Sequence, residues 1–235
     1  DIFVNAFTIA APPPLGPPPV LPPPSPPAGN IAVFDGNGLV NAAGVAYPGV
    51  GLVEPNTPFI PGPASLDPGD NLDALDVDTT PIDLLGDVYF SLDCAFDDPL
   101  ELAPGPNFGS AVANGFVGGD VLVSAPGGVP AVFAAAGALG LDLIDVDLDG
   151  FPDMDSDDLD ALILHENGIA GYQPSLVPND WMGGTTDMLL FSVRRGSSVI
   201  GQPDSIFGLP IAEGDILTTP KVGGLSSFPG IYVAA

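Results

Sequence analysis

Apolar residues in this chain occur in short runs rich in β-branched and aromatic side chains, separated by turns that contain glycine and proline. Two runs, VYFSL at 88–92 and LLFSV at 189–193, are apolar enough to predict central strands of a sheet. Residues 158–166 differ, because an aspartate precedes an Ala/Leu run and Gly168 follows it. This pattern predicts a short helix. The fold as a whole is expected to be mainly β.

The start of the chain combines an apolar strand with a stiff spacer. Residues 1–11 predict a strand with large side chains on both faces, and the proline-dominated residues 12–28 favour polyproline II, which cannot join a sheet. Each buried side chain is worth about 1.5–3 kcal/mol, so we expect the strand to insert into a neighbouring subunit, as in donor-strand complementation. Packing on its own domain is the alternative. The assembly residues would be Ile2, Phe3, Val4, Phe7 and Ile9.

From residue 29 onward the chain contains two related units, with five landmarks in the same order and loops of varying length between them. We expect the first unit to span 29–144 and the second to span 158–235. Each is expected to be a sandwich- or barrel-like set of short strands with Gly/Pro turns. The matched segments are 71–75 with 158–162, 88–92 with 189–193, 109–112 with 196–199, 119–122 with 214–217 and 130–133 with 229–232.

The two units end differently in the sequence. The first continues past Phe133 through AAAGALGLDLI to Ile144, whereas the second stops at Ala235, shortly after Tyr232. We therefore expect the second unit to lack its last segment and to present an open sheet edge. The N-terminal strand of a neighbouring subunit is expected to fill that edge.

Residues 145–157, between the units, carry aspartates at alternate positions followed by Gly150. Carboxylates at this spacing converge on one point, and calcium prefers six to eight oxygen ligands of this kind. The loop resembles the calcium loops of EF-hand-like and dockerin modules in its first half, but Ser156 stands where their bidentate acid would be. A solvated acidic turn is the alternative. The candidate calcium ligands are Asp145, Asp147, Asp149, the Phe151 carbonyl, Asp153, Asp155 and Asp157.

A second acidic cluster overlaps the first landmark of the repeat. Its spacing fits no standard metal loop, so metal binding and a solvated acidic surface both stay open. Magnesium and zinc are disfavoured, since magnesium prefers few protein carboxylates and zinc would need more than the single His and single Cys present. The candidate ligands in this cluster are Asp70, Asp73, Asp76 and Asp78.

The chain has 30 acidic residues against three basic ones, for a formal net charge of -27. This balance excludes nucleic acid and anionic membranes as expected partners, because both require a basic surface. Metal cations suit it better, with general acidity for solubility as the alternative. The absence of an initiator Met before Asp1 favours a processed, exported protein. No apolar stretch is long enough to predict a membrane-spanning helix.

Catalysis is not expected. His165 is the only histidine, and the sequence contains neither a Gly-x-Ser-x-Gly elbow nor a Gly-Lys-Ser/Thr phosphate loop. Paired carboxylates could serve a glycosidase, but nothing in the sequence singles out one pair among so many acids.

The repeated segments Asp-x-Leu-Asp-Ala-Leu, Phe-Ser and Gly-Asp-Ile/Val-Leu, between Leu66 and Ala235, resemble a class of exported bacterial surface proteins. The resemblance implies an extracellular location and no known reaction. The strand and spacer are similar in logic to donor-strand pili, although pilins usually carry a disulfide and this chain has only Cys94. We expect a calcium-stabilised subunit of a secreted fibril that assembles with itself, with glycans on the linker as a candidate modification. A monomeric surface adhesin or carbohydrate-binding module is the alternative.

Overall fold

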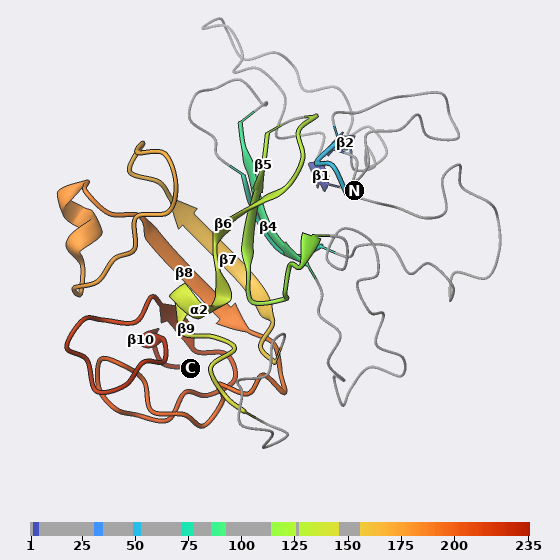
Figure 1. Cartoon of the computed structure of the whole chain (residues 1–235). Coiled ribbons are helices and arrows are strands. Elements are labelled where there is room, and N and C mark those ends of the chain that lie inside the picture. The colour runs from blue at the N-terminus through green and yellow to red at the C-terminus, as the bar shows by residue number, and fades with distance from the viewer. Residues whose placement is uncertain are drawn as a thin grey trace, which may run out of the picture.

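The structure is a computed structural model that describes residues 2–4, 31–34, 49–52, 72–77, 86–92, 114–125, 127–145 and 156–235. In this part the chain folds into two four-stranded antiparallel sheets, with very little helix (Figure 1). The expectation of a mainly β fold is confirmed.

The first sheet consists of four strands that pair in chain order, each antiparallel to the next. Every residue of the central run 88–92 is buried, as its uninterrupted apolar pattern predicted. The strands are β3 (Leu72–Val77), β4 (Val88–Leu92), β5 (Val121–Ser124) and β6 (Ala131–Ala134).

The second sheet repeats this arrangement with β7 (Leu159–His165), β8 (Met188–Val193), β9 (Ile216–Thr218) and β10 (Gly230–Val233). The helix predicted over 158–166 is therefore wrong, because these residues form β7. Leu159 and Leu162 are three positions apart and both buried, a spacing typical of a helix. The register of β7 shifts between Leu159 and Ala161, and this irregularity returns both leucines to the same face of a strand.

Four of the five matched pairs of segments overlap strands of the same rank in the two sheets, and these strands pair in the same register. In the remaining pair, 196–199 lies in the turns after β8 and 109–112 lies outside the described residues. Phe90 on β4 and Phe191 on β8, for example, each lie between two leucines at equivalent positions. The two rows of paired residues are Leu75–Phe90–Leu122 and Leu162–Phe191–Leu217.

An aspartate before the third strand makes the same contacts in each sheet. Asp120 accepts hydrogen bonds from the backbone N–H three positions earlier at 3.2 Å and from Ala136 N–H at 2.9 Å. Asp215 accepts from the backbone N–H three positions earlier at 2.8 Å and from Ala235 N–H at 2.9 Å. Each aspartate thereby joins the turn before the third strand to the chain that follows the fourth.

The segment after β6 contains the short helix α2 (Ala136–Leu139), which ends at Gly140 in a left-handed conformation. Leu139 and Leu141 are buried in the core that holds Phe191 and other residues of the second sheet. A Cβ at Gly140 would lie only 2.7 Å from the Ser227 carbonyl oxygen, so this segment packs closely on the turn before β10.

Residues 49–52 pack in the same way on the first sheet. Val50 and Leu52 are buried against Phe90, and a Cβ at Gly51 would lie 2.4 Å from the Gly128 carbonyl oxygen before β6. Residues 139–141 thus take on the second sheet the place that residues 49–52 take on the first. The expected end of the first unit at Ile144, and the missing last segment of the second unit, stay predictions.

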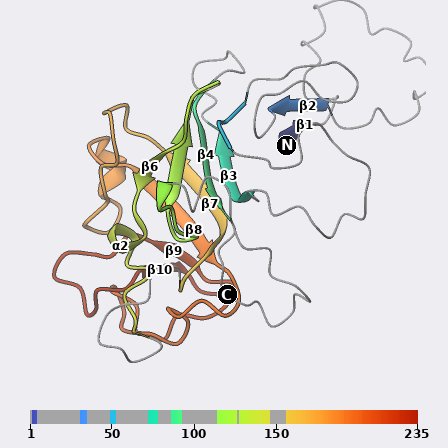
Figure 2. The ribbon, with the colours of Figure 1, turned by 45° about the vertical axis from the view of Figure 1, so that its right-hand side comes forward.

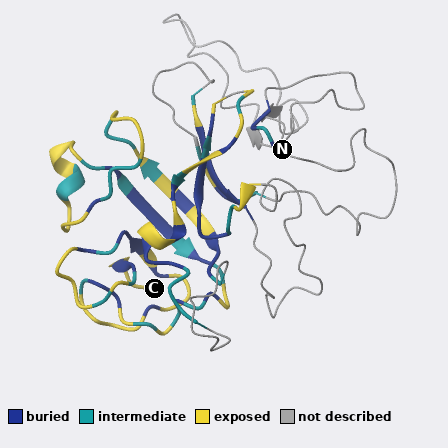
Figure 3. Ribbon diagram, viewed as in Figure 1, coloured by how far each residue is buried: buried dark blue, intermediate teal, exposed yellow. Residues whose placement is uncertain are grey.

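The two sheets meet where β3 lies against β7 (Figure 2), and one core cluster contains residues of both sheets. The Asp76 carboxylate accepts a hydrogen bond from Leu164 N–H at 2.6 Å. Ser91 Oγ accepts from Ala74 N–H at 3.0 Å and donates to the Leu159 carbonyl at 3.4 Å. The buried residues follow the central strands of both sheets (Figure 3).

The remaining strands, β1 (Ile2–Val4) and β2 (Ile31–Phe34), pair antiparallel with each other within the chain. A 3₁₀ turn, η3, covers Asp180–Gly183. None of the helices that the structure describes combines the length and the apolar character needed to cross a membrane.

Candidate functional site

The acidic loop predicted to bind calcium connects α2 and the residues after it to β7. The structure describes its two ends, Asp145 and Asp157. The other candidate ligands, Asp147, Asp149, Phe151, Asp153 and Asp155, lie outside the described residues. The contacts that the structure describes are those at the base of the loop, where its two ends meet.

Two aspartates close the base of the loop by reciprocal hydrogen bonds. Asp142 N–H donates to Asp157 Oδ2 at 2.8 Å, and Asp157 N–H donates to Asp142 Oδ1 at 2.9 Å. Ser156 N–H adds a third bond to Asp142 Oδ1 at 3.0 Å. Asp142 has a φ of 53°, a left-handed conformation that aspartate tolerates better than most residues. The loop from 143 to 155 thus begins and ends at one fixed point.

The same base is tied to the end of the second sheet. Asp157 Oδ1 accepts hydrogen bonds from Val199 N–H at 2.8 Å and from Ser198 Oγ at 3.1 Å. Burial raises the pKa of Asp157, and these hydrogen bonds oppose the rise. Both carboxylate oxygens of Asp157 accept hydrogen bonds from the protein. The geometry therefore gives this residue a role in fixing the ends of the loop rather than in binding a metal ion.

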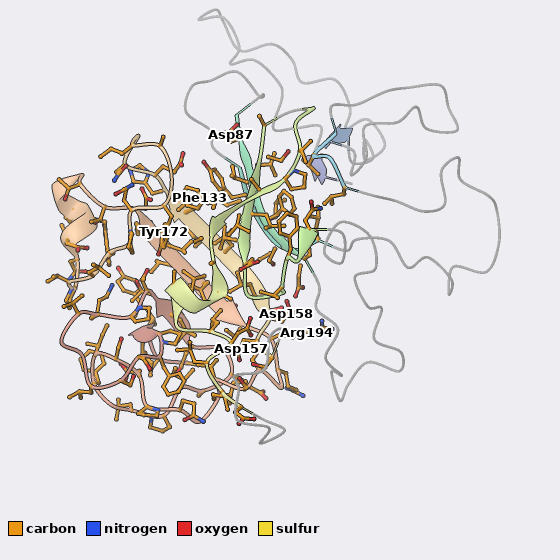
Figure 4. All side chains as sticks on the ribbon, in the orientation of Figure 1. Asp87, Phe133, Asp157, Asp158, Tyr172 and Arg194 are labelled. Atoms are coloured by element: carbon orange, nitrogen blue, oxygen red, sulfur yellow. The ribbon has the colours of Figure 1, made fainter. Side chains whose placement is uncertain are left out.

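The neighbouring aspartate forms an ion pair. Asp158 is buried, and its Oδ2 lies 3.1 Å from Arg194 Nη1. Arg194 N–H also donates to the Asp158 carbonyl at 2.8 Å. Figure 4 shows Asp157, Asp158 and Arg194 gathered in one region of the molecule. This ion pair was not predicted from the sequence, where the single signal was that Arg194 directly follows an apolar strand.

The second acidic cluster is divided between described and undescribed residues. Asp73 and Asp76 lie on β3, whereas Asp70 and Asp78 lie outside the described residues. Asp76 contacts the backbone of β7 and so helps to join the two sheets. Within the ranges that the structure describes, no three His, Cys, Asp or Glu side chains gather as a metal site would require.

Several further aspartates are buried and accept hydrogen bonds from loop backbone. The most extensive case is Asp204, whose carboxylate accepts from Ile206, Phe207 and Leu209 N–H at 2.8–2.9 Å. A longer bond of 3.3 Å comes from Ile231 N–H at the start of β10. Burial alone would raise the pKa of Asp204, but the hydrogen bonds outweigh it and hold the pKa below its ordinary value.

Lys221 is a buried cation in the segment between β9 and β10. Its Nζ donates to the Ser175 carbonyl at 2.7 Å and to Ser175 Oγ at 3.1 Å, and lies 5.8 Å from the centre of the Trp181 ring. Burial lowers the pKa of Lys221 to about 8, and the charge of Asp180 opposes this fall. Because the ammonium group is enclosed, its contacts serve the fold.

A cavity of about 410 Å³ opens at the other end of the first sheet, between β4, β6 and the turn after β7. The rings of Tyr89 and Phe133 meet edge to face in its wall, with centroids 5.0 Å apart. Asp87 and Glu166 add carboxylates to the lining. Figure 4 shows Phe133 beside Tyr172, and Asp87 above them. The cavity combines aromatic faces with hydrogen-bond acceptors.

The predicted assembly residues fall at the start of the chain. Ile2, Phe3 and Val4 form β1, and Phe3 pairs with Ala32 of β2. Phe7 and Ile9 lie outside the described residues. The pairing of β1 with β2 occurs within one chain, and insertion into a neighbouring subunit stays a prediction.

Comparisons with protein-family models, with curated proteins and with solved structures gave no match.

Proposed function

We propose that this chain is a structural subunit of a secreted, calcium-stabilised extracellular fibril. The observation that carries the proposal is the closed base of the acidic loop, where Asp142 and Asp157 hold the two ends of the loop together. We also propose that the two sheets are tandem copies of one unit in a sandwich-like arrangement, since their strands pair in equivalent registers. Such a chain supplies a rigid building block and no catalytic group.

The closed base supports calcium binding by restricting where the carboxylates of the loop can go. Residues 145–155 contain five aspartates on a loop whose ends are fixed. Without a cation these charges repel one another, and a bound calcium ion would replace that repulsion with five or more oxygen ligands. Calcium at 100 times its dissociation constant would stabilise the folded state by about 2.7 kcal/mol.

Thermal unfolding with and without calcium tests this step. We expect calcium to raise the melting temperature by several degrees, since about 1 kcal/mol corresponds to 2–4 °C in a chain of this size. Asp147→Asn should lose most of the increase, whereas Asp160→Asn, which removes an equal charge from an exposed position on β7, should keep it. Equal melting temperatures in calcium and in EDTA would rule out a calcium-stabilised loop.

The pairing of β1 with β2 supports assembly by exchange of the first strand. A two-stranded sheet is marginally stable on its own. The same three pairings, including Phe3 with Ala32, would form equally well if β1 of one copy paired with β2 of the next. The proline-rich residues 12–28 favour extended structure that suits such reach.

Engineered disulfides distinguish exchange from pairing within the chain. In a Cys94→Ser background, Phe3→Cys and Ala32→Cys place thiols on paired residues. Oxidation of assembled protein should give a ladder of covalent oligomers on non-reducing gels. Crosslinked monomers alone would refute strand donation, and Phe3→Cys without its partner serves as the control.

The cavity at the end of the first sheet favours a second candidate, a monomeric adhesin or carbohydrate-binding module. Aromatic faces stack on sugar rings, and carboxylates accept hydrogen bonds from hydroxyl groups. Phe133 and Asp87 supply both kinds of contact in one cavity. Calorimetry with soluble glycans should then detect binding that Phe133→Ala removes and Val222→Ala, an exposed change elsewhere, leaves intact. Absence of binding across a broad glycan panel would reject this candidate.

A further inference from the structure

The outer face of the second sheet is open at positions whose counterparts in the first sheet are buried. Ile216 and Val233 pair with each other on β9 and β10 and are 37% and 48% exposed. Their equivalents Val121 and Ala134 pair in the same way on β5 and β6, and both are fully buried. The sheets thus carry the same apolar face, and the part of it at Ile216 and Val233 is covered only in the first sheet. Leu190 and Thr218, on the same face of the second sheet, are buried.

The cover on the first sheet is the second unit. Val121 and Ala134 belong to the core cluster shared with the second sheet, and β7 lies against β3 at this junction. The contact extends to β7 itself, where Leu159 N–H donates to the Gly118 carbonyl at 3.2 Å and Leu164 N–H reaches Asp76. The first strand of one unit therefore covers the sheet of the unit before it.

The β3 side of this junction is also exposed in the molecule, in the part of the chain that precedes the second sheet. β3 is the equivalent of β7 in the repeat, and its Leu75 is 37% exposed. The equivalent Leu162 on β7, which belongs to the core cluster shared by the two sheets, is only 6% exposed. One molecule therefore presents both unmatched halves of its own internal contact, the open face of the second sheet and the β3 side of the first.

We infer that a second copy of this chain binds the open face of the second sheet through its β3, repeating the internal junction between molecules. The contact is head to tail, so each molecule uses two different surfaces for two neighbours, and the assembly forms an open filament unless the rotation between copies closes a ring. The inference shares self-assembly with the proposed function but requires neither calcium nor strand donation.

One substitution within the repeat shows how the contact between molecules differs from the internal one. The position of Asp76, which accepts a hydrogen bond from β7, is taken by Ile163 in the second unit, and Ile163 is 55% exposed. An apolar side chain replaces a hydrogen-bond acceptor there. We therefore expect an association that depends on concentration, with the apolar contacts of Ile163, Ile216 and Val233 as its main source.

Sedimentation velocity over about 1–200 µM tests the inference on the full chain. Wild-type protein should associate as its concentration rises, and Ile163→Asp and Leu75→Asp should each weaken association at least tenfold. Val222→Asp, which adds the same charge at another exposed apolar position, should behave as wild type. Far-ultraviolet circular dichroism verifies that each variant is folded, and Ile216→Asp replaces Ile163→Asp if that variant is not.

Mixing the two variants supplies the decisive observation. Ile163→Asp keeps an intact β3 side, and Leu75→Asp keeps an intact open face, so together they should form a dimer and nothing larger. Absence of this dimer, or a wild-type chain that stays monomeric at all concentrations, would overturn the inference. A chain without residues 1–11 should still associate. If that deletion abolishes association while Ile163→Asp does not, stacking is wrong and strand donation stands, whereas the reverse result removes strand donation and keeps stacking.

Discussion

Replacement of Asp204 by asparagine tests whether buried aspartates hold the loops of the second unit. The carboxylate accepts four backbone hydrogen bonds, three at Oδ1 from Ile206, Phe207 and Ile231, and one at Oδ2 from Leu209. Asparagine has the same shape but only one acceptor oxygen. The Leu209 N–H would then face an amide donor, and a buried donor without an acceptor costs about 1–3 kcal/mol.

The remaining hydrogen bonds would also weaken, because bonds to a charged acceptor are roughly twice as strong as neutral ones. We therefore expect Asp204→Asn to lower the free energy of unfolding by about 2–4 kcal/mol, a large part of the 5–15 kcal/mol typical of a domain. Urea unfolding followed by the fluorescence of Trp181, the single tryptophan, measures this loss in the second unit. Asp160→Asn, an equal charge change at an exposed position, should have little effect.

The pH dependence gives the same experiment a second, independent reading. The pKa of Asp204 is lower in the folded state than its ordinary value of 3.8, so its contribution is complete above that value. It is lost as the pH falls through the folded pKa. The gap between wild type and Asp204→Asn should accordingly narrow in acid. A gap that is absent at neutral pH, or that widens in acid, would refute the assignment of Asp204 as a charged acceptor.

Three further outcomes follow from other contacts. The pH dependence of stability at Asp157 should be opposite to that at Asp204, since burial raises the pKa of Asp157 above 3.8. Relative to Asp157→Asn, wild type should lose stability as the pH rises through the folded pKa, and unfolding free energies measured between about pH 3.5 and 7 check this. Gly140→Ala should destabilise the protein by at least about 1 kcal/mol, because Gly140 has a positive φ and close neighbours. Gly137→Ala in α2, with open space around it, should stabilise the protein by about 0.4–1 kcal/mol. Equal melting temperatures for the two variants and wild type would contradict both expectations. Ser91→Ala leaves the buried Ala74 N–H without its acceptor and should cost about 1–3 kcal/mol, more than Ser192→Ala at the equivalent position, as chemical denaturation can measure.

The strands could be read from the sequence because their apolar runs have the length and composition of buried strands. VYFSL and LLFSV became β4 and β8, and the repeat predicted which strands would correspond. The error at 158–166 has a local cause, since a register shift after Leu159 gives a strand the leucine spacing of a helix. A shift of one residue in pairing leaves no mark in a single sequence.

The organisation of the units was harder to predict for a different reason. Residues 139–141 follow β6 in the chain but pack on the second sheet, next to Ser227 and Pro229. Their short pattern, apolar–Gly–apolar, recurs at 50–52, but three residues are too few to be recognised without knowing that both glycines have positive φ. Packing on the second sheet therefore fixes where residues 139–141 lie, and their place in the chain did not reveal it.

The acidic residues were the least predictable part of the site, because a buried acceptor and a metal ligand look alike in sequence. Asp120, Asp204 and Asp215 receive backbone N–H groups, and these donors satisfy a buried carboxylate without a cation. The contacts described for the three basic residues are also internal: Arg194 and Arg195 pair with Asp158 and Glu213, and Lys221 binds Ser175.

The backbone donors around buried aspartates and the ion pairs of the arginines together limit which carboxylates would need calcium. Aspartates with a shell of N–H donors require no metal, and neither do those paired with arginine. The loop at 145–155, with five aspartates, stays the predicted calcium site, and its ends meet at a base in which Asp142 and Asp157 use their oxygens on each other's backbone. We therefore expect calcium to affect the opening of this loop and not the unfolding of the sheets. Removing the metal should loosen the connection between the two units before it affects either sheet, and hydrogen exchange at Ser198 and Val199, whose groups contact Asp157, should rise first on addition of EDTA.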